Sequence, residues 1–194
     1  LRLVEAVEKG KSLVGLPNLI FRDDKGIHAN KDVCSEDLSK LPPPDFDGLA
    51  LKKYFVPKLI LPYLATRGCY WGRCTFCDHF QGYAEGFRTM QVDQIVEEIK
   101  FLKKKYNTRY FHFTDESYPP ALFRKLSQRL IDEKLDIVWT THMRFEETLL
   151  EEKVWNEAHA SGCRYLHFGF ESGNQRVLKL MDKATKLDAI ETNL

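Results

Sequence analysis

The sequence lacks a surplus of charge of either sign. Its 194 residues include 29 Lys and Arg against 28 Asp and Glu, which leaves a formal net charge of +1. Without a basic surplus there is no broad positive surface to attract nucleic acid or an anionic membrane. We therefore expect no nucleic-acid partner, and we interpret the lysine-rich stretch KFLKKKY, residues 100–106, as the solvated face of a helix.

Long apolar runs are also missing. No stretch reaches the length of a membrane span, and the first residues do not show the charged and then apolar segments of a signal peptide. Five cysteines, three of them close together, fit a reducing compartment in which thiolates remain available to a metal. We expect a cytoplasmic protein with no membrane segment.

A starting methionine is absent as well. The chain opens on Leu1 within a stretch of helical spacing and ends within another, KATKLDAIETNL. We therefore expect a piece of a longer protein. We divide this piece into residues 1–50, the tail of an upstream domain with a hairpin and a linker, and residues 51–194, the start of a second domain.

Three features of the N-terminal part support that division. Residues 1–10 predict a helix with Gly10 as its C-cap, and the alternating pattern around residues 24–26 predicts a hairpin. Three consecutive prolines then exclude a helix or a central strand. We expect an extended connector at residues 41–50 and place the domain boundary there.

From Lys58 onward, apolar runs alternate with helical patterns. The runs are apolar throughout, which is typical of parallel strands covered by helices, and the segments between them repeat apolar residues at helical spacing. The sequence therefore predicts an α/β fold with a parallel sheet, wound in one direction as part of a barrel. The predicted strands are residues 58–66, 109–117, 135–144 and 163–172, and the predicted helices are residues 92–102, 119–134, 145–162 and 174–183.

The feature around which the chain is organised is the loop TRGCYWGRCTFCDH, residues 66–79. Cys69, Cys74 and Cys77 supply three soft ligands in a C-x4-C-x2-C pattern, which indicates a soft metal centre. One alternative is a structural zinc site with His79 as fourth ligand. Three cysteines without an obligatory fourth ligand fit a cubane iron–sulfur cluster better, because one iron is then free to bind substrate or cofactor. A disulfide is the weakest alternative, since it leaves one of the three thiols unpaired.

This loop resembles that of the radical S-adenosylmethionine (SAM) enzymes. The resemblance rests on the cysteine spacing, on Arg67–Gly68 before it, on Phe76 before the last cysteine and on the apolar run KLILPYLAT. The more common family spacing is C-x3-C-x2-C, so this loop is one residue longer. The resemblance implies a six-unit, partly open (β/α) barrel, of which residues 58–190 supply four units.

The same resemblance implies the cofactors. A 4Fe-4S cluster held by Cys69, Cys74 and Cys77 would chelate SAM through its open iron, and an external donor of the flavodoxin or ferredoxin type would supply the electron that cleaves SAM to methionine and a 5′-deoxyadenosyl radical. Phe76 matches the aromatic residue beside the adenine, although burial under the loop explains such a ring equally well.

Polar residues at the ends of the second and third predicted strands are further candidates, because reactive groups in such barrels lie at these ends. Asp115 and Glu116 suit the position that accepts hydrogen bonds from the methionine amino group, or they complement the next helix N-terminus. Arg144 suits the methionine carboxylate, or it pairs with Glu146 and Glu147.

The fourth predicted strand ends in GFESG and continues as NQRVLKLMDKAT, which closely resembles the methylthiotransferase and cobalamin-linked branches of the family. The resemblance implies that Glu171 and Ser172 face the ribose hydroxyls or the methionine group of SAM. A carboxylate buried there would need a donor, and a cofactor supplies one. The N-terminal helix, hairpin and connector likewise resemble the join to a cobalamin-binding domain, which implies cobalamin as a candidate cofactor of the longer protein. The alternative is an arbitrary N-terminal extension.

We interpret the remaining candidates as structural: His112 and His167 as core or interlayer residues, and Cys34 and Cys163 as isolated thiols. The predicted function is therefore a radical SAM enzyme, an iron–sulfur oxidoreductase or transferase that uses the radical or transfers a methyl group. The alternatives are an iron–sulfur electron-transfer protein and a non-enzymatic zinc module. The last predicted strand, CRYLHFGFE, would be an unpaired edge, so we expect this piece to self-associate.

Overall fold

The computed structural model describes residues 2–78, 86–188 and 190 of the chain. The chain divides into two compact units, Leu1–Asp37 and Leu38–Leu194. The connector at residues 41–50, where the sequence suggests a boundary, groups with the second unit. Among the described residues, no helix is both long enough and apolar enough to cross a membrane.

The first unit contains one helix and one antiparallel hairpin, as the sequence predicts. The Asp23 carboxylate closes the hairpin turn by accepting a 2.8 Å hydrogen bond from the Lys25 amide, and Gly26 follows with a φ of +125° that favours glycine. The elements are α1 (Arg2–Glu8), β1 (Ile20–Asp23) and β2 (Gly26–Ala29).

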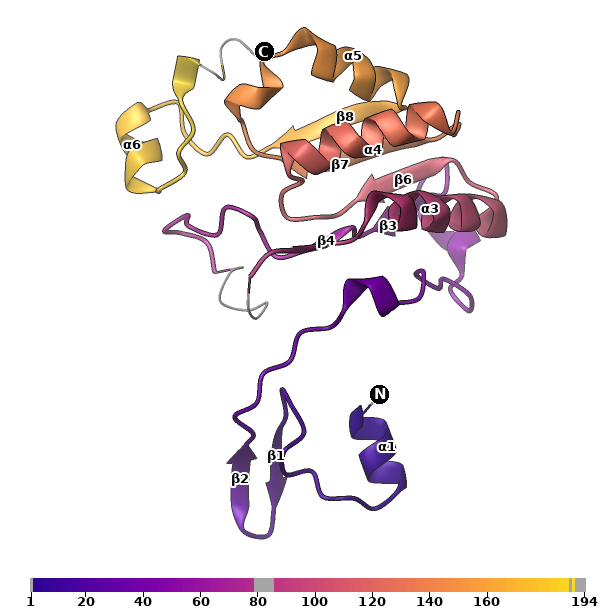
Figure 1. The fold of residues 1–194 in the computed structure, drawn as a ribbon, viewed down its shortest axis with the longest axis vertical. Helices are drawn as coiled ribbons and strands as arrows, with labels where there is room; N and C mark the ends of the chain where they lie inside the picture. The colour runs from indigo at the N-terminus through magenta and orange to yellow at the C-terminus, as the bar shows by residue number, and fades with distance from the viewer. Residues whose placement is uncertain (1, 79–85, 189, 191–194) are drawn as a thin grey trace. The chain divides into compact units, whose positions relative to one another are not determined.

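The second unit is a parallel sheet that alternates with helices, and the predicted α/β pattern is confirmed. Its strands lie in the order β3-β6-β7-β8 and all run parallel. Figure 1 shows α3, α4 and α5 side by side along one face of this sheet. The strands are β3 (Ile60–Tyr63), β6 (Tyr110–Phe113), β7 (Val138–Met143) and β8 (Cys163–Phe168), and the helices are α3 (Val92–Tyr106), α4 (Pro120–Asp132), α5 (Glu152–Ala160) and α6 (Gln175–Leu180).

Two predicted elements are divided in the structure. Within the strand expected over residues 58–66, the structure forms only β3, which ends at Tyr63. The chain then forms β4 (Thr66–Arg67), which pairs antiparallel with β5 (Arg88–Thr89). The helix expected over residues 145–162 begins as the 3₁₀ turn η3 (Glu147–Leu149) and restarts as α5 after Glu151, whose backbone is extended. Two further 3₁₀ turns are η1 (Leu38–Lys40) and η2 (Leu51–Lys53).

Alternate side chains of the strands form the core against α3, α4 and α5. Leu61, Phe113 and Trp139 are each at most 1% exposed. The Phe113 ring packs edge-on against Trp139 with 5.4 Å between ring centroids and against Tyr63 with 5.3 Å. Rings of this size dominate core energetics. The core thus holds the strand ends, and the loops that follow them, in place.

The connector is anchored to the end of α3. Asp45 accepts a 2.8 Å hydrogen bond from the Tyr106 hydroxyl and pairs with Lys105 at 2.9 Å. The Phe46 amide donates to the same hydroxyl at 2.7 Å, and the Phe46 and Tyr106 rings pack edge-on. These contacts explain why the proline-rich stretch belongs with the second unit.

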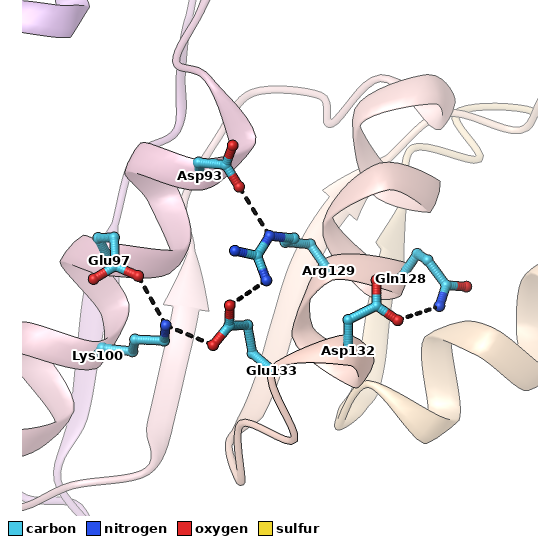
Figure 2. Close-up of polar contacts among 7 residues, drawn as sticks. All are labelled: Asp93, Glu97, Lys100, Gln128, Arg129, Asp132 and Glu133. Carbon is cyan, nitrogen blue, oxygen red and sulfur yellow. Dashed lines mark hydrogen bonds and ion pairs between the residues drawn. The ribbon is translucent and has the colours of Figure 1, made fainter.

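Charged side chains join the outer surfaces of α3 and α4, as Figure 2 shows. Arg129 pairs with Asp93 at 2.8 Å and with Glu133, and Glu133 pairs with Lys100 at 2.7 Å. Ion pairs in solvent contribute little individually, so this network adds to a helix contact that the core already specifies.

Candidate metal and cofactor site

The carboxyl ends of β6, β7 and β8 and the cysteine loop enclose one cavity of about 370 Å³. Parallel strands bring their carboxyl ends to the same edge of a sheet, so residues far apart in sequence meet there. The lining residues are Cys69, Cys74, Phe76, Cys77, Glu116, Ser117, His142, Met143, Arg144, His167, Phe168, Gly169, Glu171 and Lys183.

The structure brings the three cysteines of the loop to this one cavity. Gly68 turns the chain out of β4 with a φ of +78°, and a Cβ there would lie 3.3 Å from the Gly86 carbonyl oxygen. Within the loop, the Cys77 amide donates to the Cys74 carbonyl at 3.1 Å. The glycine therefore allows a tight turn that a larger residue would oppose.

The spacing of these thiols bears on which metal group they fit. Among the described residues, no three Cys, His, Asp or Glu side chains lie close enough to hold a single metal ion. A 4Fe-4S cluster makes a different demand, because each thiolate binds a different iron and the sulfurs stand apart around one cavity. All three cysteines line one cavity, as a cluster site requires. His79, the fourth ligand of the zinc alternative, lies outside the described residues.

The cysteine loop is held by the segment that follows α6, residues 181–183. The Thr75 amide donates to the Met181 carbonyl at 3.0 Å, and the Trp71 indole N–H donates to the Asp182 carbonyl at 2.7 Å. Arg73 adds an ion pair with the Asp182 carboxylate at 3.0 Å. The shape of the loop therefore depends on a segment that is distant in sequence.

Arg144 is buried at the cavity wall, where its residue is 6% exposed. Its guanidinium lies 4.0 Å from the Trp71 ring centroid, and its Nη2 donates to the Lys183 carbonyl at 2.5 Å. Glu146 is 3.4 Å away, whereas Glu147 pairs with Lys186. The Arg144 Nη1 atom is buried and has no partner among the described residues. A cavity ligand with a carboxylate would satisfy it.

The adjacent carboxylates of Asp115 and Glu116 have different surroundings. Asp115 is fully buried and does not line the cavity: its Oδ1 accepts from the Ala65 amide at 3.1 Å and from the Thr66 amide and hydroxyl at 2.6 Å. Burial raises the pKa of Asp115 to about 6, and the Thr66 hydrogen bonds limit the rise. Glu116 does line the cavity, and its buried Oε2 has no partner among the described residues. Of the two predicted residues, only Glu116 faces the site.

Residues 63–193, more than half of the chain, match the Radical SAM superfamily. The chain belongs to the radical SAM superfamily.

Two of the curated relatives that this chain matches are named methyltransferases. An uncharacterized methyltransferase of Pyrococcus horikoshii is 27% identical over 198 residues, covering 98% of this chain and 42% of that protein. The bacteriochlorophyllide d C-12(1)-methyltransferase of Chlorobaculum tepidum is 30% identical over 167 residues, covering 81% of this chain and 36% of that protein. This chain thus spans about two fifths of the length of these two curated relatives.

A solved structure has the same fold. TsrM from Kitasatospora setae, a radical SAM methyltransferase solved with cobalamin and a 4Fe-4S cluster bound, matches with a TM-score of 0.71 at 16% identity. The match covers 99% of this chain and 40% of that one. It confirms the predicted partial (β/α) barrel of the radical SAM type.

In this radical SAM chain, Glu171 faces the cavity and Ser172 does not. Glu171 has a left-handed φ of +59° and pairs with Lys183 at 2.7 Å between Oε1 and Nζ. Ser172 instead accepts a 3.1 Å hydrogen bond from the Asn174 amide, next to the N-cap of α6. Sequence reasoning did not select Lys183 as a site residue, although it lies in the NQRVLKLMDKAT segment that resembles the cobalamin-linked branch.

Phe76 lines the cavity and is 55% exposed. Burial under the loop therefore does not explain this ring in the structure. The centroid of its ring lies 5.9 Å from the Lys183 ammonium nitrogen.

Three histidines form a cluster on the sheet face opposite the helices. The rings of His112, His142 and His167 lie 5.0–5.8 Å apart between centroids. His167 is exposed and His112 is half-buried, so the structure differs from the interpretation of both as core residues. Burial lowers the pKa of His112, and the two neighbouring imidazoles lower it further. His142 and His167 also line the cavity.

Cys163 lies apart from the cavity. Its residue is 6% exposed, and burial raises the pKa of its thiol to about 12. Such a thiol stays protonated and inert.

Proposed function

We propose that this chain carries the cluster and SAM sites of a radical SAM methyltransferase. The observation that supports this most strongly is the cavity in which Cys69, Cys74 and Cys77 face the unpartnered polar atoms of Glu116 and Arg144. In this proposal the three thiolates hold a 4Fe-4S cluster. The open side of the cavity then binds the methionine end of SAM.

The polar residues match the two groups of that methionine end. Arg144 Nη1 would donate to the carboxylate, and Glu116 Oε2 would accept from the amino group, which satisfies two buried atoms that otherwise have no partner. Glu171 and Phe76 line the same cavity and are the candidates for the ribose and the adenine. When bound there, SAM supplies either a 5′-deoxyadenosyl radical or a methyl group.

Asp115 and Ser172 have positioning roles in this proposal. Asp115 fixes residues 65 and 66 at the entry to the cysteine loop, and Ser172 fixes the turn before α6. Neither side chain needs to touch the cofactor for the site to keep its shape.

Methyl transfer with cobalamin is the reaction class that the relatives favour. Both relatives described above are named methyltransferases, and the structurally similar TsrM holds cobalamin as well as the cluster. We propose that residues 1–50 join this barrel to a cobalamin-binding domain in the whole protein. We further propose a cytoplasmic location and an electron donor of the flavodoxin or ferredoxin type.

The decisive experiment is anaerobic reconstitution with iron and sulfide. We expect a 4Fe-4S cluster, detected by iron and sulfide analysis and by electron paramagnetic resonance, that is lost when Cys74 is changed to Ala. Cys34→Ser is the matched control, because Cys34 is exposed and lies in the first unit. If the triple change of Cys69, Cys74 and Cys77 to Ala still bound the same iron, the site assignment would be wrong.

The same samples separate the alternatives. If the protein purified without added metal contains zinc in place of iron, the non-enzymatic zinc module is favoured. Zinc that is retained in the Cys74→Ala variant would indicate that His79 is one of its ligands. A cluster that accepts electrons but neither binds nor cleaves SAM would favour an electron-transfer protein.

A further inference from the structure

Lys183 places a buried positive charge beside the cysteine loop. Its side chain is 6% exposed, and it lines the same cavity as the three cysteines. The ammonium lies 5.9 Å from the ring of Phe76, which stands between Cys74 and Cys77 in the loop. The ammonium therefore acts on the cysteine loop at short range.

The surrounding backbone leaves room for this ammonium and its partner. The Lys183 Nζ lies 2.7 Å from the Glu171 Oε1. A Cβ on Gly169, at the end of β8, would lie 2.7 Å from each of these two atoms. Glycine at this position leaves room for the ion pair against the strand end, and a larger residue would displace the tips of these two side chains. The pair is thus built into the wall of the cavity.

The backbone of Lys183 ties the same residue to the loop. Its carbonyl accepts a hydrogen bond from Arg144, whose guanidinium stacks on Trp71 of the cysteine loop. The preceding residue, Asp182, accepts the Trp71 indole N–H. The ammonium and the loop therefore keep a defined separation.

The two members of the pair differ in solvent exposure. The Glu171 side chain is 33% exposed, against 6% for Lys183. Water screens the carboxylate more than the ammonium, so the positive charge is only partly cancelled at the cysteines. Reduction of an iron–sulfur cluster adds one negative charge, and nearby charge is one of the main influences on its potential. A buried ammonium stabilises the reduced form relative to the oxidised form.

We propose that Lys183 raises the reduction potential of the cluster held by Cys69, Cys74 and Cys77, and that Glu171 moderates this effect. The inference rests on the proposed function, because it requires a cluster at these cysteines. Lys183 is a positioning residue here: it transfers neither a proton nor an electron. The electron comes from an external low-potential donor and is taken up by the cluster.

The test compares substitutions at the two ends of one ion pair. In the reconstituted protein without SAM, we expect Lys183→Met to lower the midpoint potential and Glu171→Gln to raise it, each measured by redox titration followed by electron paramagnetic resonance. A tenfold change in the ratio of reduced to oxidised cluster corresponds to about 59 mV for one electron. Both substitutions break the same 2.7 Å contact, so a purely structural role would shift both potentials in the same direction.

Two control variants sharpen the result. Lys183→Arg keeps the positive charge, so the midpoint potential should stay close to that of the unchanged protein. Lys186→Met removes a lysine three residues away whose side chain is 69% exposed, so solvent should screen its charge and leave the potential unchanged.

The failure of this inference is distinguishable from failure of the proposed function. If the unchanged protein assembles no cluster at its cysteines, the proposed function is wrong. If it assembles the cluster and Lys183→Met leaves the potential unchanged or raises it, the inference is wrong. Should Lys183→Met fail to assemble a cluster, Glu171→Gln decides alone: a higher potential supports the role of Lys183, and an equal or lower potential overturns it.

Discussion

The helix-covered face of the four-stranded sheet differs from its open face. On the covered face, Leu61, Phe113 and Trp139 are at most 1% exposed, and their rings and methyl groups interlock with α3, α4 and α5. On the open face, Ile60 is 46% exposed and Tyr165 is 73% exposed. The same strands supply both faces, because successive side chains point in opposite directions. The covered face stabilises the fold, whereas the open face and the strand ends present polar groups such as the histidine cluster.

The largest expected effect is on the covered face. Changing Trp139 to Ala removes a fully buried ring that packs on Phe113 and Phe123, and it leaves the Ser161 carbonyl without its indole donor. We expect a loss of about 3–5 kcal/mol in the free energy of unfolding, measured by urea titration. His167→Ala on the open face is the control and should change stability by less than about 0.5 kcal/mol. Equal losses would mean that the two faces do not differ in this way.

The next effect is at Asp115, where the covered sheet meets the cysteine loop. Asp115→Ala leaves the Ala65 amide and the Thr66 amide and hydroxyl without their acceptor. We expect a loss of about 1–3 kcal/mol, measured in the same way. Asp115→Asn keeps an acceptor oxygen and should retain most of the stability. If Ala and Asn were equally destabilising, the hydrogen bonds would not be the cause.

The pH dependence of Asp115 gives a separate prediction. Its pKa is raised to about 6 in the folded protein, so the folded state binds the proton more tightly than the unfolded state. This contribution to stability is fully present below about pH 4 and is lost as pH rises through about 6. A shift of this size corresponds to roughly 3 kcal/mol. Denaturant titrations at a series of pH values should show that fall in the unchanged protein and not in Asp115→Asn.

The open face and the edge of β8 predict self-association. Among the described residues, β8 pairs only with β7, and its exposed Tyr165 lies beside an unpaired edge. We expect a concentration-dependent dimer in sedimentation experiments, weakened at least about tenfold, or about 1.4 kcal/mol, by Tyr165→Lys. A monomer over a wide concentration range, with the β8 amides protected from hydrogen exchange, would show that this chain covers its own edge.

The smallest effect is on the outer surface of the helices. Glu133→Gln removes the carboxylate that joins Lys100 and Arg129 in the network of Figure 2. We expect a small fall in the midpoint of thermal unfolding at low salt that disappears at high salt, because these side chains are in contact with water. A fall that persists at high salt would indicate that packing, and not charge, is lost.

Much of the fold could be predicted from periodicity. Apolar runs and helical spacing depend only on local sequence, and they identified all four parallel strands and the helices between them. The pair β4 and β5 could not be predicted in this way, because each strand has only two residues and their pairing depends on the path of the intervening chain. The division of the helix before β8 was missed for a related reason, since one extended residue, Glu151, interrupts a pattern that is otherwise helical.

The sequence by itself determined which part of the chain is the candidate for metal binding. Three thiols within nine residues lie close together in any compact conformation of the loop, so Cys69, Cys74 and Cys77 were recognisable from spacing alone. The family-like segments around Phe76 and Glu171 were recognisable in the same way. Both residues line the cavity.

Only the tertiary structure decided which polar side chains share the cavity with the cysteines. Asp115 and Glu116 are neighbours in sequence, yet Asp115 is hydrogen-bonded to Thr66 and Glu116 faces the cavity. Lys183 reaches the cysteine loop because the end of α6 packs against Trp71 and Thr75. The physical reason is that a side chain's direction and partners depend on which loops meet at the strand ends. Local periodicity does not carry that information, because these contacts join residues far apart in the chain.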